Sequence, residues 1–126
     1  LDIGILVNEF SKANSKSDIK TVLDLNGNVM YFSRSDIPCS SNNEFLKAYH
    51  IVPFRSAFLQ KYTSLPRSPL EICESNEYLR VLQNGITIRA LKVESSAISV
   101  DTLSDLQIVR EKMIADPFFP LYNNLG

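Results

Sequence analysis

Short apolar runs, separated by polar stretches rich in serine and asparagine, occupy the first two thirds of the chain. Runs of β-branched and aromatic residues that end at turn residues predict β-strands. The runs that we interpret as strands are residues 3–7, 19–23, 29–33, 45–55, 86–93 and 98–100. The second and third of these flank Asn26-Gly27, the dipeptide that two-residue hairpin turns favour. The sequence therefore predicts a β-hairpin at this place.

A helical pattern begins shortly before residue 70. Residues 68–71, Ser-Pro-Leu-Glu, supply an N-cap, a proline at the first helical position and a capping box. Asn84-Gly85 is typical of the left-handed ending of a helix. Between these limits one apolar stripe recurs at helical spacing, made of Leu70, Cys73, Leu79 and Leu82. The pattern predicts one helix with a buried stripe.

Two other helices are indicated by capping residues. Ser56 is a candidate cap for a short helix over 57–65. Residues 102–105, Thr-Leu-Ser-Asp, form a second capping box and predict a helix that continues to about Ala115. The tail, 116–126, contains two prolines and two phenylalanines, and we expect it to pack as an irregular segment.

The order of strand, helix, strand and helix in the second half predicts an α/β fold with the hairpin as an excursion. The length of 126 residues, 44% of them hydrophobic, fits a single domain over 1–126. A net charge of -1 gives no general attraction to nucleic acid or to an anionic membrane. No apolar run approaches the roughly 20 residues of a membrane helix. We expect neither nucleic acid nor membrane as a partner.

The chain has two cysteines, Cys39 in a polar loop and Cys73 in the predicted helix. Two thiols in a chain of this size favour a reducing, cytoplasmic compartment and free thiols, although one disulfide would be feasible. Neither cysteine has a histidine at the spacing of a zinc site.

Two residues stand where functional groups gather in α/β folds. Asp101 follows an apolar run and precedes a capped helix, a position where a carboxylate can hold magnesium. The alternative is an ordinary loop or pre-cap aspartate. Arg34 leaves a predicted strand between two serines, and its guanidinium suits a carboxylate or a phosphate. The alternative for Arg34 is an exposed surface arginine.

The other titratable candidates have simpler interpretations. His50 is the only histidine, and a single histidine in an apolar strand is more often structural than catalytic. Glu71 is explained by capping, and Glu74 and Glu77 are expected on a solvated helix face. The sequence contains no nucleophile motif of the G-x-S-x-G type and no phosphate-binding glycine loop. Hydrolase chemistry therefore has no support.

Three blocks of sequence together resemble the C-terminal half of the 3-deoxy-manno-octulosonate (Kdo) cytidylyltransferases, also called CMP-Kdo synthetases. The blocks are IKTVLDLNGNVMYFSRSDIP (19–38), RSPLEICESNEYLRVLQNGITI (67–88) and VDTLSDLQIVR (100–110). They resemble the family's V-K-V-V-x-D-x-x-G-x-A-L-Y-F-S-R-x-x-I-P hairpin, its P-S-P-L-E-x-x-E-x-L-E-Q-L-R helix and its V-D-T-P-E-D-L-E-x-V-R segment. Three blocks in order and in register are much more specific than any one alone.

The resemblance implies a fold, a reaction and a set of site residues. The fold would be the C-terminal portion of a Rossmann-like nucleotide-diphospho-sugar-transferase fold. The family transfers a cytidylyl group from CTP to an eight-carbon acid sugar, with Mg²⁺, for lipopolysaccharide or capsule biosynthesis. By resemblance, Arg34 and Glu77 would bind the acid sugar, and Asp101 would be a catalytic, metal-binding aspartate. The hairpin and its neighbours would build a homodimer interface.

The chain also departs from the family pattern. The nucleotide-binding N-terminal half is not in this sequence, so the chain alone is expected to be inactive. The strand H-x-G-I-Y-x-Y-R appears as residues 48–55, AYHIVPFR, where Ala48 replaces the histidine and Val52 a tyrosine, and Tyr78 replaces a glutamine further on. His50 lies two residues on, about 7 Å along the same strand face, and would partly substitute as a sugar ligand. These changes leave two alternatives open: a degenerate, non-catalytic dimerisation or binding module, or a relative that acts on a sialic or amino-sugar acid.

Overall fold

The computed structural model describes residues 1–126 with the exception of 40, 41, 43, 50, 95–97, 99, 101 and 124–126. The chain divides into two compact units, Leu1–Glu94 and Ser95–Gly126, and each is described by itself. The single domain over 1–126 stays a prediction.

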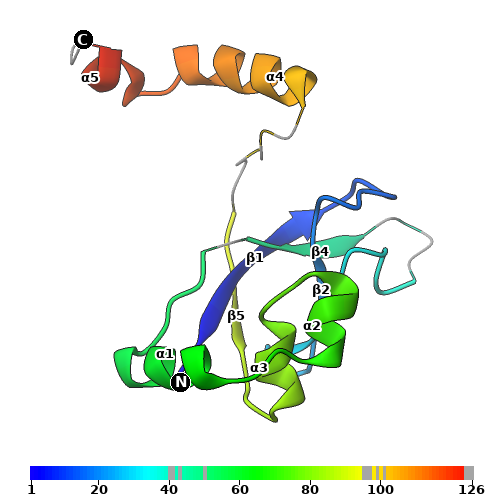
Figure 1. Ribbon diagram of the computed structural model, residues 1–126. Coiled ribbons are helices and arrows are strands. Elements are labelled where there is room, and N and C mark those ends of the chain that lie inside the picture. Colours follow the sequence, from blue (N-terminus) through cyan, green and yellow to red (C-terminus); the bar gives the residue numbers. More distant parts are fainter. Residues whose placement is uncertain are drawn as a thin grey trace. The chain divides into compact units, whose positions relative to one another are not determined.

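The first unit is built on a mixed five-stranded sheet (Figure 1). Its strands are β1 (Gly4–Phe10), β2 (Lys20–Leu23), β3 (Val29–Ser33), β4 (Phe45–Ala48) and β5 (Arg89–Lys92). They lie in the order β3-β2-β4-β1-β5, and the starts of β3 and β5, which end this order, also bond to each other: Val29 N–H donates to Ile88 O and Ala90 N–H to Gly27 O. β1 and β5 are parallel, as a connection through helices allows, and the other neighbours are antiparallel. This sheet, together with the helices described below, confirms the predicted α/β fold class.

The predicted hairpin joins β2 to β3. The Asp24 side chain accepts hydrogen bonds from the backbone N–H groups of Asn26 and Asn28, each at 2.8 Å. Gly27 has φ +80°, a conformation that glycine adopts without steric cost. The turn is therefore stabilised by its own residues, which is why the sequence reveals it.

Three helices complete the first unit: α1 (Ser56–Ser64), α2 (Pro69–Glu74) and α3 (Leu79–Gln83). Figure 1 shows them near the end of the sheet where β1 begins. A single hydrophobic core joins them to the strands. Its fully buried members include Ile3, Ile5, Val7, Phe32, Leu79, Val81 and Ile88. Burial of this apolar surface is the main favourable contribution to folding.

The start of α2 has the predicted capping box, formed by Ser68 and Glu71, with Pro69 in the first turn. Glu71 does more than cap: it is buried, with 4% of its surface exposed. Its carboxylate accepts two hydrogen bonds from Arg80 of α3, one of them 2.8 Å from Nε to Oε2. Burial opposes ionisation of Glu71, but the bonds from Arg80 and the Ser68 backbone outweigh it and lower its pKa. This ion pair connects α2 to α3.

The single helix expected from residue 68 to residue 84 is wrong. Ser75 adopts a left-handed conformation, φ 50° and ψ 49°, and separates α2 from α3. Cys73, which was expected in the buried stripe, is exposed. Cys39 is also exposed, and both thiols are free, as expected. The predicted end at Gly85 is confirmed by its φ of +69°.

Other boundaries differ from the prediction. β4 is only Phe45–Ala48, but the chain stays beside β1 beyond this strand. The backbone N–H groups of Leu6 and Gly4 donate to Ile51 O and Pro53 O, and Ile3 forms an isolated bridge with Phe54. The cap of α1 is Arg55, in extended conformation, and Ser56 is already helical. The run 98–100 forms no strand at its described residues, and Ile98 and Val100 are 36% and 50% exposed. Residue 99 of this predicted strand lies outside the described residues.

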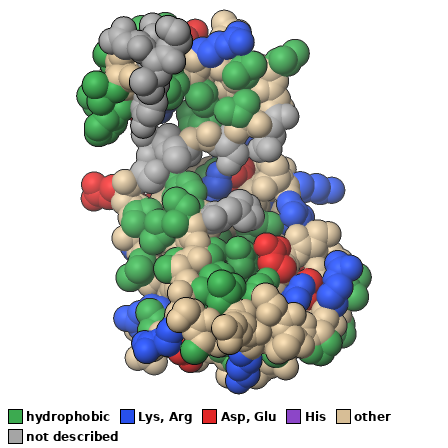
Figure 2. Space-filling model, turned by 60° about the vertical axis from the view of Figure 1, so that its left-hand side comes forward, with side chains coloured by type: hydrophobic (Ala, Val, Ile, Leu, Met, Phe, Trp, Pro, Cys, Tyr) green, Lys and Arg blue, Asp and Glu red, His purple; other side chains and the backbone are tan. Residues whose placement is uncertain are grey.

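The second unit contains α4 (Leu103–Ile114) and α5 (Phe119–Asn123). The Thr102 hydroxyl accepts from the Asp105 backbone N–H, which confirms the predicted capping box. α5 corrects the expectation of an irregular tail. Large apolar side chains are exposed on both units (Figure 2), among them Leu25, Met30, Leu103 and Ile114. In the described part of the chain, no helix combines the length and apolar character needed to cross a membrane.

Candidate functional site

Arg34 directly follows β3 and is half-buried, where an exposed surface arginine was the alternative. Each of its three guanidinium nitrogens donates to a backbone carbonyl. Nε donates to Glu74 O at 3.0 Å, and Nη2 donates to Ser75 O at 3.3 Å. Nη1 donates to Lys16 O at 3.0 Å. The backbone of two distant segments therefore determines where this guanidinium lies.

The guanidinium of Arg34 retains capacity for an anion. A guanidinium has about five N–H groups, and the three bonds use one on each nitrogen. One N–H on each terminal nitrogen is left, which is the number that one bidentate carboxylate accepts. The two bonds made by the terminal nitrogens are exposed, so this end of the side chain is accessible to solvent.

Glu74 does not lie on a solvated face, as the sequence predicted, but against the end of β3. One carboxylate oxygen accepts from Ser33 Oγ at 2.8 Å and from Tyr31 Oη at 3.3 Å. The other accepts from the Arg34 backbone N–H at 2.9 Å. Burial opposes ionisation of Glu74, but these hydrogen bonds outweigh it and hold its pKa below the ordinary value. Burial, and the negative charge of Glu74, raise the pKa of Tyr31.

Lys20 contacts the backbone of Arg34. Its side chain is fully buried, and its ammonium donates to three backbone carbonyls: Ser15 O, Asp18 O at 2.9 Å and Arg34 O at 2.6 Å. The Asp36 carboxylate lies 3.5 Å from Nζ. This residue was missed at the sequence level, although a lysine inside an apolar strand run was a usable signal, because such a charge must find partners if it is buried.

A second ion pair supports the same loop. The Asp18 carboxylate pairs with Lys47 and accepts from Ser15 Oγ at 2.5 Å. The Lys47 ammonium also lies 5.5 Å from the centroid of the Phe10 ring. Residues 15–18 are thereby attached to β1, β2 and β4. The carbonyl of Lys16, which holds Arg34, belongs to this segment.

The other predicted site residues are only partly brought together. Glu77 is exposed, three residues beyond Glu74. Tyr78 is half-buried and packs on Phe32, with 6.4 Å between ring centroids. His50 and Asp101 lie outside the described residues, so the structure leaves both as predictions.

The positions that depart from the family pattern, Ala48, Val52 and Tyr78, all contact the hydrophobic core. Ala48 is only 4% exposed. A core position of this kind favours a small apolar side chain, because a larger polar one would have to be accommodated in tightly packed surroundings.

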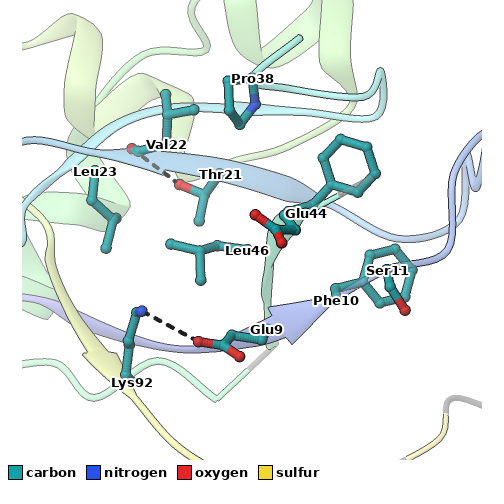
Figure 3. Close-up of a pocket in the computed structure, with 11 residues that line it drawn as sticks. Glu9, Phe10, Ser11, Thr21, Val22, Leu23, Pro38, Glu44, Leu46 and Lys92 are labelled. Carbon is teal, nitrogen blue, oxygen red and sulfur yellow. Dashed lines mark hydrogen bonds and ion pairs between the residues drawn. The ribbon is translucent and has the colours of Figure 1, made fainter. Parts of the chain in front are cut away.

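A separate cavity of about 880 Å³ opens at the end of β1. In Figure 3, Glu9 of β1 forms an ion pair with Lys92 of β5, and the Leu46 side chain lies between them and Thr21. The cavity is also lined by apolar residues of β2 and β4. Neither Arg34 nor Glu77 is among its lining residues, so it is distinct from the Arg34 site. Among the residues that the structure describes, no three His, Cys, Asp or Glu side chains are grouped as a metal site.

Comparisons with known proteins bear on this geometry. A family model described as cytidylyltransferase matches residues 3–89. The 3-deoxy-manno-octulosonate cytidylyltransferase of Chlorobium limicola is 37% identical over 113 residues, which are 86% of this chain and 46% of that protein. The enzyme of the same name from Synechococcus elongatus is 42% identical over 99 residues, 75% of this chain and 41% of that protein. The chain therefore spans less than half the length of these relatives.

A solved structure shows the same relation. The structure of CMP:2-keto-3-deoxy-manno-octonic acid synthetase complexed with CTP superposes with a TM-score of 0.81 and 36% sequence identity. The match covers 91% of this chain and 50% of that one. It confirms the expected fold class and the expectation that the sequence corresponds to one part of a longer fold.

Proposed function

Because the chain belongs to the cytidylyltransferase family, we propose that it forms the sugar-binding part of an enzyme that activates Kdo or a related acid sugar with CTP. In that reaction the anomeric hydroxyl oxygen bonds to the α-phosphorus of CTP and loses its proton. The bond from that phosphorus to the pyrophosphate group breaks, and pyrophosphate leaves. The product would serve lipopolysaccharide or capsule synthesis, in the cytoplasm, where free thiols such as Cys39 and Cys73 are stable.

The observation that supports this proposal most is the way in which the Arg34 guanidinium is held. Its guanidinium is held by three backbone carbonyls and keeps one N–H on each terminal nitrogen. A pre-oriented pair of donors binds a sugar carboxylate with little loss of conformational freedom. Glu77 is three residues from Glu74 and exposed, so its carboxylate is available to sugar hydroxyls. His50 is proposed as a further sugar contact, and Ala48 and Val52 would add no polar group.

Magnesium is the cofactor that we propose for the complete enzyme. Bound Mg²⁺ would balance the negative charge of the phosphates. Asp101 would supply one carboxylate ligand, the kind of oxygen donor that this ion prefers. The described residues of this chain contain no complete set of ligands for the ion.

A homodimer built around the β2–β3 hairpin is also proposed. β3 is the last strand in the sheet order and bonds to the chain around β5 only at its start, and two large apolar side chains of the hairpin are exposed, Leu25 fully and Met30 at 62%. Exposed apolar groups on a sheet edge are suited to an interface. Sedimentation equilibrium of the chain measures this directly, and a monomer at micromolar concentration would contradict it.

The sugar site is tested by measuring how the ammonium salt of Kdo binds to the 126-residue chain. The binding is measured by calorimetry or from NMR chemical-shift changes. We expect Arg34→Ala to weaken binding roughly 100-fold, because two charge-assisted hydrogen bonds are lost. Arg34→Lys should also lose at least about tenfold, since an ammonium cannot form the paired contact. Binding of Kdo that is unaffected by Arg34→Ala would refute the proposed site.

A second candidate is a non-catalytic module, or a relative specific for another acid sugar, and the packed positions Ala48, Val52 and Tyr78 favour it. N-acetylneuraminate and Kdo, compared in the same titration, separate the two sugar specificities. If neither sugar binds, the result favours the non-catalytic module. In the complete protein that contains this chain, pyrophosphate release from CTP and Kdo that is lost in Asp101→Asn would exclude a non-catalytic role.

A further inference from the structure

The end of α2 is shaped around Arg34. The last carbonyls of a helix have no partner within the helix. Ser75 turns left-handed directly after α2, and the carbonyls of Glu74 and Ser75 accept from Arg34 Nε and Nη2 instead. The break that divides the expected long helix thus provides two of the three acceptors that hold the guanidinium.

The Glu74 side chain keeps this helix end in place. Its carboxylate does not contact the guanidinium. It accepts from the backbone N–H of Arg34 and from the hydroxyls of Ser33 and Tyr31, at 2.9, 2.8 and 3.3 Å respectively. These contacts join α2 to β3 across 40 or more residues of sequence. Besides the attraction between the two charges, the carboxylate acts on the guanidinium through the position of the helix end.

We propose that Glu74 is a positioning residue, which docks the end of α2 against β3 so that the carbonyls of Glu74 and Ser75 orient the Arg34 guanidinium toward an acid-sugar carboxylate. The inference rests on the proposed function, because that function supplies the carboxylate. Lys20, which donates to the Arg34 carbonyl, restrains the backbone of the same residue. The guanidinium is thereby oriented before any ligand arrives, and preorganisation of this kind increases affinity without adding contacts.

Hydrogen exchange of the Arg34 Nε–H, measured by NMR on the ¹⁵N-labelled chain, reports this orientation. The resonance is assigned by its disappearance in Arg34→Lys. In Glu74→Ala we expect the exchange rate to rise roughly tenfold, because the acceptor at Glu74 O is no longer held in place. The backbone amides of Ile5 and Val7, in the core strand β1, should stay within about twofold, since local opening leaves the core intact.

Two conservative variants test separately the length and the charge of the side chain at position 74. Glu74→Gln keeps the length, and its remaining oxygen can accept from the Arg34 N–H while the hydroxyls rotate to accept from the amide. Its exchange rate should stay within about threefold of the unmodified chain. Glu74→Asp keeps the charge but is one methylene shorter, so it cannot reach all three donors, and we expect an increase of about threefold or more. Glu111→Gln, an exposed site on α4, is the matched control and should change nothing.

Titration with Kdo completes the test. The Kd should rise roughly tenfold in Glu74→Ala and follow the exchange rates in the other variants. An Arg34 Nε–H exchange rate that is unchanged in both Glu74→Ala and Glu74→Asp would overturn the inference. So would a rise of the same factor in the Ile5 and Val7 amides, because Glu74 would then only stabilise the fold. If the unmodified chain binds no Kdo, the proposed function fails, and exchange alone decides the positioning role.

Discussion

The ion pair between Glu71 and Arg80 offers a quantitative test of how the first unit is held together. The perturbation is Glu71→Ala, which removes a carboxylate whose side chain is only 5% exposed and leaves the guanidinium of Arg80, 17% exposed, without its anion. Breaking a buried pair by removing one partner costs about 3–5 kcal/mol. Arg80 keeps a hydrogen bond to Leu65 O and a contact with the Tyr62 ring, 5.3 Å from its centroid. We therefore expect the lower end, about 3 kcal/mol.

Urea and thermal unfolding measure this loss. The chain has no tryptophan and 5 tyrosines, so tyrosine fluorescence and far-ultraviolet circular dichroism are the probes. For a domain of this size, 3 kcal/mol corresponds to a fall in Tm of roughly 12–24 °C. Glu77→Gln, an exposed site nearby, is the control and should stay within about 0.5 kcal/mol.

A double-mutant cycle with Arg80→Met assigns the energy to the pair. In the Arg80→Met background, Glu71→Ala should cost at least about 1.5 kcal/mol less than in the unmodified chain, since the partner is already gone. A loss below about 1 kcal/mol in the single variant would refute the reasoning, because the pair would then behave like an exposed one.

The same residue predicts a pH dependence. The pKa of Glu71 is lowered in the folded state, so its ionised form stabilises the fold. That contribution is complete above the unfolded value, about 4.3, and is lost as the pH falls through the lower, folded pKa. Glu71→Gln should therefore lose stability at neutral pH but show a flatter decline of the free energy of unfolding in acid. An identical acid slope in both proteins would contradict this assignment.

Two further substitutions test single features of the fold. Lys20→Met should destabilise the first unit by about 3 kcal/mol in urea unfolding, because three carbonyls and Asp36 lose a buried partner; a neutral effect would show that the ammonium contributes nothing net. Gly85→Ala should cost about 1 kcal/mol, with Gly85→Asn costing less. A Cβ at Gly85 would meet nothing within 4 Å, so any loss there comes from its φ of +69° alone.

The features that the sequence predicted well are those stabilised within a few residues. Asp24 accepts from residues two and four positions further on, and the Glu71 carboxylate accepts from the Ser68 backbone N–H three positions earlier. In such cases the interacting groups are neighbours in the chain, so their spacing is visible in the sequence. The Arg34 position was found in the same way, from a strand that ends at a polar residue. The resemblance to the family then indicated the ligand that we propose for Arg34.

Only the tertiary structure decided the role of Glu74 and the burial of Lys20. From the sequence, Glu74 was one of several acids on a helix, but its partners lie 40 or more residues earlier, on β3. The break at Ser75 also contacts a distant residue, because the Arg34 guanidinium bonds the Glu74 and Ser75 carbonyls once the sheet has brought it beside α2. Structure that depends on neighbouring residues can thus be predicted from the sequence, whereas long-range hydrogen bonds exist only once the chain has folded.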